Sequence, residues 1–221
     1  ARDLTTARRI VATAEQIFAE QGLAGARMDE IARVAKVNKA LLYYYFRSKE
    51  ELYRFVLETL LSQLRAGIGV KTAAPVSPGK RLAAVIDNFF DFVQRHPNYP
   101  RLIQRVMMSR GPNMEWIVSE YYRPLHGQLV SLIEAGISSG EFRLLDTRNT
   151  AFTVISIMVF YFSAAPVLSR ILGLDPLHPD VYCRSLLLRP DPFGLLRGRW
   201  IVEEMVASDV VCQVVRSEAA G

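Results

Sequence analysis

The sequence predicts an all-α protein in which a small helix-turn-helix domain precedes a larger helical domain. Apolar residues recur at helical spacing over most of the 221 residues, and no segment carries a strong strand pattern. Two short amphipathic segments are separated by a turn at residues 35–38. Hydrophobic residues make up 50% of the chain, which is enough for a full core in one or two domains.

The first helix is predicted at residues 7–21. Its apolar residues fall on one face, and Gly22 follows as a helix-ending glycine. The apolar face consists of Ile10, Val11, Ala14, Ile17 and Phe18.

Residues 28–49 predict two short helices joined by a tight turn. Asn38 precedes the second helix, where its side-chain oxygen can accept a hydrogen bond from an amide of the first turn. Two helices crossed through such a turn form a helix-turn-helix, whose second helix fits a major groove. The apolar positions are Met28, Ile31, Ala32 and Ala35 in the first helix and Leu42, Tyr45 and Phe46 in the second.

The outward face of the second helix is basic, small or hydroxyl-bearing, as contact with phosphates and base edges requires. A competing interpretation is that its tyrosines cover an edge of the core. We expect that of Tyr45, which lies three residues from Leu42. The outward residues are Lys39, Ala40, Tyr43, Tyr44 and Arg47.

Four motifs in this region resemble the TetR family of transcriptional regulators in order and spacing. Several motifs at matching spacing over the first quarter of the chain are a more specific signal than any one motif. They are Met28-Asp29-Glu30-Ile31-Ala32, Val37-Asn38-Lys39, Leu42-Tyr43-Tyr44-Tyr45-Phe46 and Ser48-Lys49-Glu50-Glu51-Leu52.

The chain departs from the family pattern at three positions. Lys36 stands where a glycine is usual, and a left-handed backbone there would cost about 1 kcal/mol. Leu41 and Tyr45 replace the commoner threonine and histidine. We expect these differences to change which DNA sequence is read, not whether DNA is bound.

The resemblance implies a homodimeric regulator whose two recognition helices enter successive major grooves of a near-palindromic operator. Repression is the expectation, and activation is left open. Residues 1–48 would form the DNA-binding domain, the helix at 49–66 the connection, and residues 49–221 the effector-binding and dimerisation domain. The residues implied at base edges are Lys39, Ala40, Leu41 and Tyr43, with Ala40 or Leu41 against a thymine methyl. Those implied at phosphates are Arg27, Asn38, Tyr44 and Lys49.

Caps and breaks divide the rest of the chain into helices. Ser48 and Glu51 form a capping box before a helix that ends at Ala66, ahead of Gly67 and Gly69. Residues 67–77 are predicted as a loop. The later helices are predicted at 78–95, begun by Ser77-Pro78; at 99–110; at 113–138, capped by Asn113 and kinked at Pro124; at 147–172, capped by Asp146; at 178–189; and at 200–215.

The segment at 147–172 is the most hydrophobic of the chain. No charged residue lies between Arg148 and Arg170, which is long enough to span a bilayer. Polar residues and Pro166 dilute it, however, and no second span accompanies it. We therefore interpret it as a helix buried against its own core and a second subunit. The family resemblance places the homodimer interface at the helices near 147–189.

The resemblance also implies a pocket for a small, largely apolar or aromatic effector in the larger domain. Aromatic and methionine residues at helical spacing are mainly core residues, so polar-tipped side chains are the better candidates. The candidate effector-binding residues are Arg105, Met108, Trp116, Tyr122, His126 and Tyr161.

Composition is consistent with a nucleic-acid partner. The net charge is +5, and residues 1–66 carry 11 basic against 8 acidic residues. The two cysteines form no C-x-x-C pattern and the three histidines lie far apart, which predicts reduced thiols in a cytoplasmic protein without metal or other cofactor. No signal-peptide segment is expected at the start of the chain.

Parts of the sequence also fit two other functions. Gly136-Ile137-Ser138-Ser139-Gly140 fits the G-x-S-x-G motif of hydrolases, and Asp175 and His178 follow in the hydrolase order. That motif needs a strand before Ser138, whereas the preceding residues read as a helix. The other alternative is a helical ligand-binding protein with a vestigial DNA-binding head.

Overall fold

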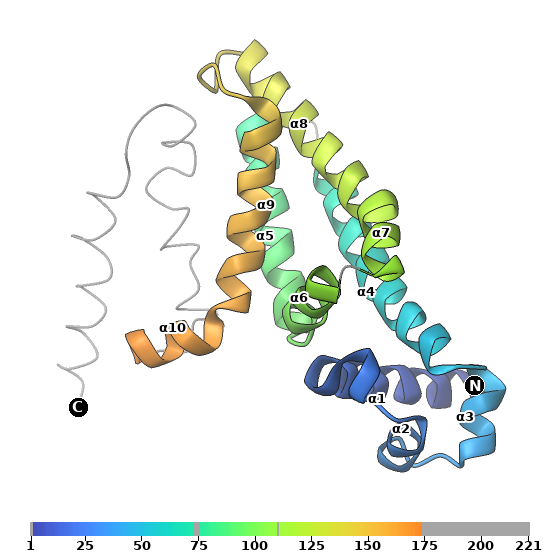
Figure 1. Ribbon diagram of the computed structural model, residues 1–221. Coiled ribbons are helices and arrows are strands. Elements are labelled where there is room, and N and C mark those ends of the chain that lie inside the picture. The colour runs from blue at the N-terminus through green and yellow to red at the C-terminus, as the bar shows by residue number, and fades with distance from the viewer. Residues whose placement is uncertain (1, 73–75, 110, 174–221) are drawn as a thin grey trace. The chain divides into compact units, whose positions relative to one another are not determined.

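The computed structural model describes residues 2–72, 76–109 and 111–173, and they are helical with short connections (Figure 1). The predicted all-α class is confirmed for this part of the chain. The chain packs as two compact units, Ala1–Ala66 with Phe92–Arg123 and Gly67–Asp91 with Pro124–Gly221. The predicted division at residue 48 follows function instead of packing, and it stays a prediction.

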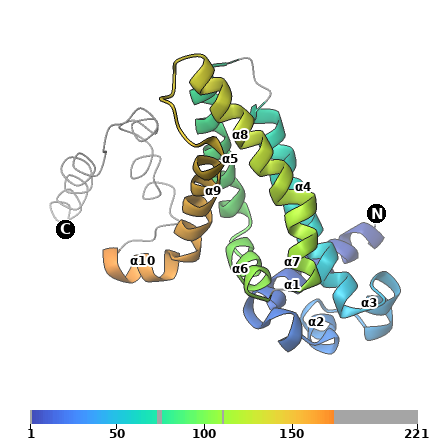
Figure 2. The same ribbon diagram turned by 45° about the horizontal axis from the view of Figure 1, so that its top comes forward.

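The first unit is built around α1. This helix packs on α2 on one side and on α6 on the other, and α2 packs on α3 (Figures 1 and 2). Its core contains Ile10, Phe18, Ile31, Leu42 and Leu102, each at most 1% exposed. The helices are α1 (Arg2–Gly25), α2 (Met28–Val34), α3 (Lys39–Tyr45), α4 (Lys49–Thr72) as far as Ala66, α6 (Tyr99–Ser109), α7 (Pro112–Ile117) and the π-helical turn η1 (Val118–Tyr122).

The second unit pairs α5 (Pro78–Arg95) with α9 (Thr147–Ser163). The ring centroid of Phe162 in α9 lies 5.8 Å from that of Phe89 and 4.9 Å from that of Phe90, both in α5. Both views show the two helices side by side (Figures 1 and 2). The unit also contains α8 (Arg123–Ser138) and α10 (Ala165–Leu172).

Caps confirm three of the predicted helix starts, at Asn38, Ser48 and Asp146. Asp146 accepts a hydrogen bond from the Asn149 amide, 3.0 Å away, at the start of α9. Helix α5 begins at Pro78, as predicted. The carboxylate of Glu141, a residue that follows α8, accepts hydrogen bonds at the N-terminus of α5. Glu141 accepts from the Gly79 amide and the Ser77 hydroxyl, both at 3.1 Å. A negative charge there is favourable because the helix dipole is positive at this end.

Several predicted boundaries were wrong. Helix α1, predicted at 7–21, spans Arg2–Gly25, and Gly22 kinks it instead of ending it. Helix α4 continues past Gly67 and Gly69 to Thr72. Gly67 serves close packing instead of termination, since a Cβ there would lie 2.6 Å from the Asn88 amide group. Gly111, not Asn113, is the N-cap of α7, because Pro112 starts the helix without needing an amide partner.

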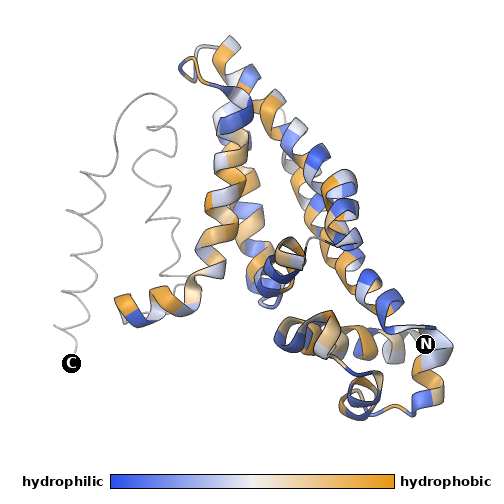
Figure 3. Ribbon diagram, in the orientation of Figure 1, coloured by the Kyte–Doolittle hydropathy of each residue, from blue (hydrophilic) through white to orange (hydrophobic). Residues whose placement is uncertain are grey.

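The predicted helix at 147–172 is two helices. It breaks at Ala164, just before Pro166, which lacks the amide that a continuous helix needs. Within the described ranges no single helix is long and apolar enough to cross a bilayer. Helices α9 and α10 are long and apolar enough only when they are taken together, and they meet at a bend of 64°. Figure 3 shows the hydrophobic residues along both.

The kink predicted at Pro124 takes the form of η1. This π-helical turn separates α7 from α8 directly before the proline. Its five residues, Val118–Tyr122, include Tyr121 and Tyr122.

The residues around Ser138 do not form a hydrolase elbow. They end helix α8, so no strand precedes the serine. Gly136 lies under the ring of Phe142, where a Cβ would overlap the ring. Asp175, His178 and the helices predicted at 178–189 and 200–215 lie outside the described residues.

Candidate nucleic-acid interface

The turn between α2 and α3 sets the angle of the predicted helix-turn-helix. Met28, Ile31 and Ala32 of α2 are buried, as is Leu42 of α3. The turn is closed by the Val37 amide, which donates to the Ala32 carbonyl at 3.0 Å. Between them Lys36 adopts a φ of 53°, the left-handed backbone that its position predicted.

Asn38 caps α3, as predicted. Its side-chain oxygen accepts a hydrogen bond from the Leu41 amide at 2.6 Å. Because the oxygen is used inside the protein, a phosphate contact by Asn38 must come from its amide nitrogen.

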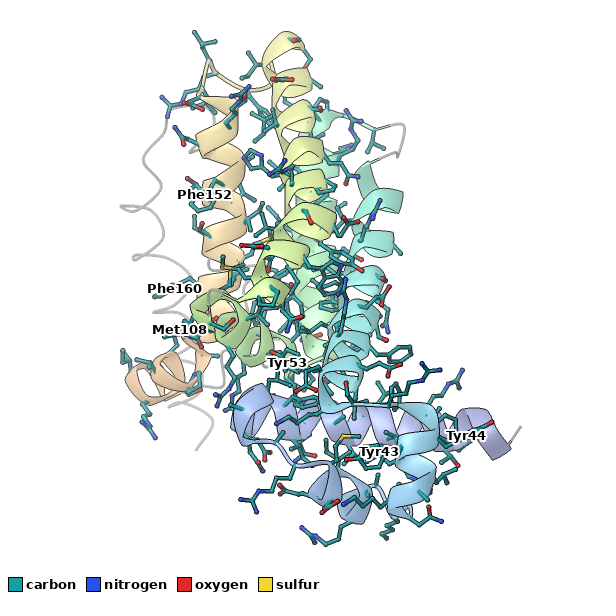
Figure 4. The ribbon with its side chains drawn as sticks, turned by 45° about the vertical axis from the view of Figure 1, so that its right-hand side comes forward. Tyr43, Tyr44, Tyr53, Met108, Phe152 and Phe160 are labelled. Carbon is teal, nitrogen blue, oxygen red and sulfur yellow. The ribbon has the colours of Figure 1, made fainter. Side chains whose placement is uncertain are left out.

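The outward face of α3 is open to solvent. Tyr43 is 40% and Tyr44 76% exposed, and both side chains are labelled in Figure 4. Lys39 and Ala40 are also exposed, and Leu41 is half-buried. Tyr45 is half-buried, with its ring centroid 6.5 Å from that of Phe46. Tyr45 is thus less exposed than the two outward tyrosines, as expected of a residue that covers an edge of the core.

Lys39, the first residue of α3, forms an ion pair with Asp29 in the first turn of α2. The Lys39 Nζ and Asp29 Oδ1 atoms are 2.7 Å apart, and the two side chains are 59% and 69% exposed. The hydrogen bond and the charge of Asp29 raise the pKa of Lys39. Sequence reasoning missed this pair, whose partners are ten residues apart and meet only through the turn.

Lys49, predicted at a phosphate, donates hydrogen bonds to the end of α1. Its ammonium lies 3.0 Å from the Ala26 carbonyl and 3.5 Å from that of Ala24. It therefore satisfies carbonyls that lack helical partners. An ammonium has three N–H groups, so one remains for a phosphate.

The capping box before α4 holds the chain between α3 and α4. The Glu51 amide donates to the Ser48 hydroxyl at 3.1 Å, and the Glu51 carboxylate accepts from the Arg47 amide at 2.9 Å. Arg27, the remaining predicted phosphate contact, is exposed and immediately precedes α2.

Arg105, a predicted effector-binding residue, holds α1 and α6 together. Its guanidinium donates to the Ala19 carbonyl at 3.1 Å and to the Glu20 carbonyl at 2.6 Å. These carbonyls precede Gly22, where α1 is kinked by a φ of 71° and a ψ of 176°. A second link joins the Asn98 amide to the Glu15 carboxylate at 3.3 Å, and burial raises the pKa of Glu15.

Tyr122 is the predicted effector residue that lines a hollow. The hollow comprises about 160 Å³ of empty space, part of it open to solvent, and it is too narrow to hold a water molecule. Burial raises the pKa of Tyr122 to about 12, and that of the neighbouring buried Tyr99 well above its ordinary value. The hollow's remaining wall is apolar and consists of Ile103, Val106, Met107, Met114, Ile117 and Val118.

The other predicted effector residues have different neighbours. Met108 is 78% exposed. Trp116 carries the Arg54 guanidinium 4.5 Å from its ring centroid. In the second unit, the His126 ring lies 2.9 Å from the Arg148 carbonyl, and Tyr161 packs on Phe90.

Two family models match this chain, one near its N-terminus and one over the larger part that follows. The family model described as "Bacterial regulatory proteins, tetR family" matches residues 10–56, and "Tetracyclin repressor-like, C-terminal domain" matches residues 78–185. The HTH-type transcriptional repressor NicS of Pseudomonas putida is 32% identical over 178 residues, which cover 77% of this chain and 82% of NicS.

Two solved structures share the fold. The ketosteroid transcriptional regulator KstR2 of Mycobacterium tuberculosis has a TM-score of 0.64 at 23% identity and covers 75% of this chain and 91% of its own. AibR in complex with isovaleryl coenzyme A and operator DNA has a TM-score of 0.61 at 20% identity. The match covers 71% of this chain and 85% of the AibR chain. Such identities show the fold alone.

Proposed function

Because the chain belongs to the TetR family of bacterial transcriptional regulators, we propose that it is a repressor that leaves a near-palindromic operator when a small effector binds. Members of this family bind operator DNA and small-molecule effectors. Repression is supported by the likeness to NicS, which is named a repressor. AibR, which shares the fold, is described in complex with isovaleryl coenzyme A and operator DNA, so this fold can bind both a small ligand and an operator.

The exposed face of α3 is the observation that carries the DNA-binding part of the proposal. Lys39, Ala40, Leu41 and Tyr43 face base edges in the major groove. Arg27, Asn38, Tyr44 and Lys49 hold phosphates, Asn38 through its amide nitrogen and Lys49 through its remaining N–H group.

The apolar face of α9 supports a homodimer through the helices near 147–189. Phe152 and Phe160 are 65% and 73% exposed and lie on one side of the helix (Figure 4). Ile157 of α9 and Val167 and Ile171 of α10 are exposed as well, at 43%, 57% and 72%. A second copy covering this face would hide apolar surface from water and supply the second head that a palindrome requires.

The hollow beside Tyr122 supports an effector site between α6 and the α7–η1 segment. Its wall is apolar and Tyr122 supplies a hydroxyl, so it suits a small uncharged molecule with one hydrogen-bonding oxygen or nitrogen. A bound anion would be buried without a counter-ion, which is costly. Entry of such a molecule must widen the space beside α6. Because α6 carries Arg105, this displacement would pull on the kink of α1.

Selection from random duplex DNA with the purified protein tests this function. Recovery of a two-fold symmetric sequence, with half-sites about one helical turn apart or a multiple of it, is the expected result. Sequence-independent binding that salt abolishes would contradict the proposal and favour the alternative of a vestigial head on a ligand-binding protein.

A further inference from the structure

The ion pair between Asp29 and Lys39 lies on the face that the proposed function turns toward DNA. Lys39 is the first residue of the recognition helix, and Asp29 reaches it from the other helix of the pair at 2.7 Å. Both side chains are more than half exposed, so the carboxylate and the ammonium are open to an approaching duplex.

The neighbouring carboxylate has a different environment. Glu30 is half-buried, and both of its oxygens accept from the Gln21 side chain at 3.1 Å. The two adjacent acids therefore differ in what they hold: Glu30 fixes α2 to α1, whereas Asp29 holds a cation of the reading face.

Asp29 alters how Lys39 can meet DNA. An unpaired lysine on this face would bind any phosphate within reach and release a counter-ion, whatever the base sequence. When Lys39 pairs with Asp29, the carboxylate offsets the ammonium charge that faces the backbone, and the contact favours one direction of the nitrogen. Its other N–H groups can still donate to the O6 and N7 acceptors of a guanine in the major groove.

We propose that Asp29 is a specificity-determining residue, which lowers affinity for arbitrary DNA and directs Lys39 to a base-edge acceptor of the operator. The inference rests on the proposed function, since it needs α3 to face the groove. Asp29 acts through Lys39 and is a positioning residue.

The test compares Asp29→Asn with Glu30→Gln in the full-length chain. Each variant removes one negative charge from the same turn of α2, so Glu30→Gln controls for net charge. Dissociation constants are measured for the selected operator and for a scrambled duplex of equal length over a range of salt concentrations.

For Asp29→Asn we expect affinity for the scrambled duplex to rise about three- to eightfold at 0.1 M salt, with a salt slope steeper by about one unit. Operator affinity should change less than about twofold. The specificity ratio, which is the affinity for the operator divided by that for the scrambled duplex, should therefore fall. Glu30→Gln should shift both affinities together. An equal specificity ratio in the two variants would overturn the proposal.

Lys39→Gln gives a second, independent test. If Asp29 acts through Lys39, Asp29→Asn should leave the specificity ratio unchanged in the Lys39→Gln background. The same loss of specificity in that background would overturn the proposal. If the wild-type protein selects no operator, the proposed function itself is refuted. If it selects an operator but Asp29→Asn has the same specificity ratio as the wild type, this inference alone is refuted.

Discussion

Lys36 holds a left-handed backbone in the turn between α2 and α3, with a φ of 53° and an exposed side chain. Its Cβ is crowded by the backbone, and glycine is free of this strain. We predict that Lys36→Gly raises the free energy of unfolding by about 0.5–1 kcal/mol, because the relief of strain exceeds the added chain entropy of glycine.

Urea denaturation measures this change, and Lys36→Ala is the matched control. Alanine removes the same charge as glycine but keeps the Cβ. If Lys36→Ala stabilised the protein as much as Lys36→Gly, the gain would come from the charge and not from the backbone.

Lys49 has two roles in this account, a link to α1 and a phosphate contact. We predict that Lys49→Ala lowers the free energy of unfolding by about 1–2 kcal/mol, because the carbonyls of Ala24 and Ala26 lose their donor. We also predict that the salt slope of DNA binding falls by about one unit. An unchanged slope in a folded variant would leave Lys49 its structural role alone.

At the residue scale, local chemistry could be predicted and long-range partners could not. The cap at Asn38 and the strained turn at Lys36 follow from neighbours within a few positions. The acceptors of Lys49 and Arg105 are backbone carbonyls far along the chain, which any residue type could supply. The sequence shows that a cation is present, but not which carbonyl packing will bring to it.

Helices α1 and α6 meet at the kink at Gly22, where Arg105 closes the end of a helical segment. A Cβ at Gly22 would lie 3.2 Å from the Arg105 guanidinium, so the kink and the arginine fit each other closely. We predict that Arg105→Ala lowers the free energy of unfolding by about 1–2 kcal/mol, since two carbonyls lose a charged donor.

Arg101 is the control for that change. It is an exposed arginine one turn earlier on α6. Chemical denaturation of Arg101→Ala should show a loss below about 0.5 kcal/mol. Equal losses in the two variants would show that Arg105 stabilises the protein through general charge or helix propensity, not through α1.

His96 follows the last residue of α5 and couples stability to pH. Its ring stacks on Phe92 at 4.7 Å and lies 3.0 Å from the Gln63 side-chain oxygen. Burial, with a smaller effect of Arg95, lowers the pKa of His96 below its ordinary 6.5. The unfolded chain therefore binds this proton more readily, and stability from His96 is lost as pH falls from 6.5 through the folded pKa.

We predict that His96→Gln, which cannot take up this proton, loses less stability than the wild type between pH 7.5 and 5.5. Urea denaturation at both pH values measures the difference. An identical pH dependence in the two proteins would show that other groups account for it.

At the element scale, helix starts were predicted better than helix ends. Ser48 and Asp146 cap by hydrogen bonds within their own first turns, which the sequence order determines. Gly67 looked like a helix stop, but its lack of a side chain serves contact with Asn88, a partner the sequence could not indicate. Pro166 broke a helix that its apolar run had suggested was continuous.

The assembly is expected to depend on α9, because a palindrome is read by two heads at once. We predict that Phe160→Asp makes the protein monomeric at micromolar concentration, since it places a charge on the apolar face. Operator affinity should then fall by about 10²-fold or more, because the second head no longer binds as part of the same molecule.

Sedimentation velocity measures the mass, and Leu144→Asp is the control. Leu144 is 87% exposed but lies in the connection between α8 and α9. It should remain dimeric with full operator affinity. A dimeric Phe160→Asp would exclude Phe160 from the interface.

For the molecule as a whole, the apolar run at 147–172 predicted a surface for another subunit, and the structure exposes part of that surface on α9. The head was predictable because its motifs are local. The proposed effector site was harder to predict. Of the six candidate residues, Tyr122 lines the hollow beside α6, and which aromatic residue faces a hollow depends on how the helices cross.

The central claim is that two copies of α3 read one operator, and equilibrium binding to three duplexes tests it most directly. These are the selected palindrome, the same duplex with one half-site scrambled, and a fully scrambled duplex, with the bound stoichiometry measured for each. We predict two protomers on the palindrome, affinity about 10²-fold or more weaker with one half-site, and the weakest, most salt-sensitive binding to the scrambled duplex. Equal affinity for all three would contradict the account.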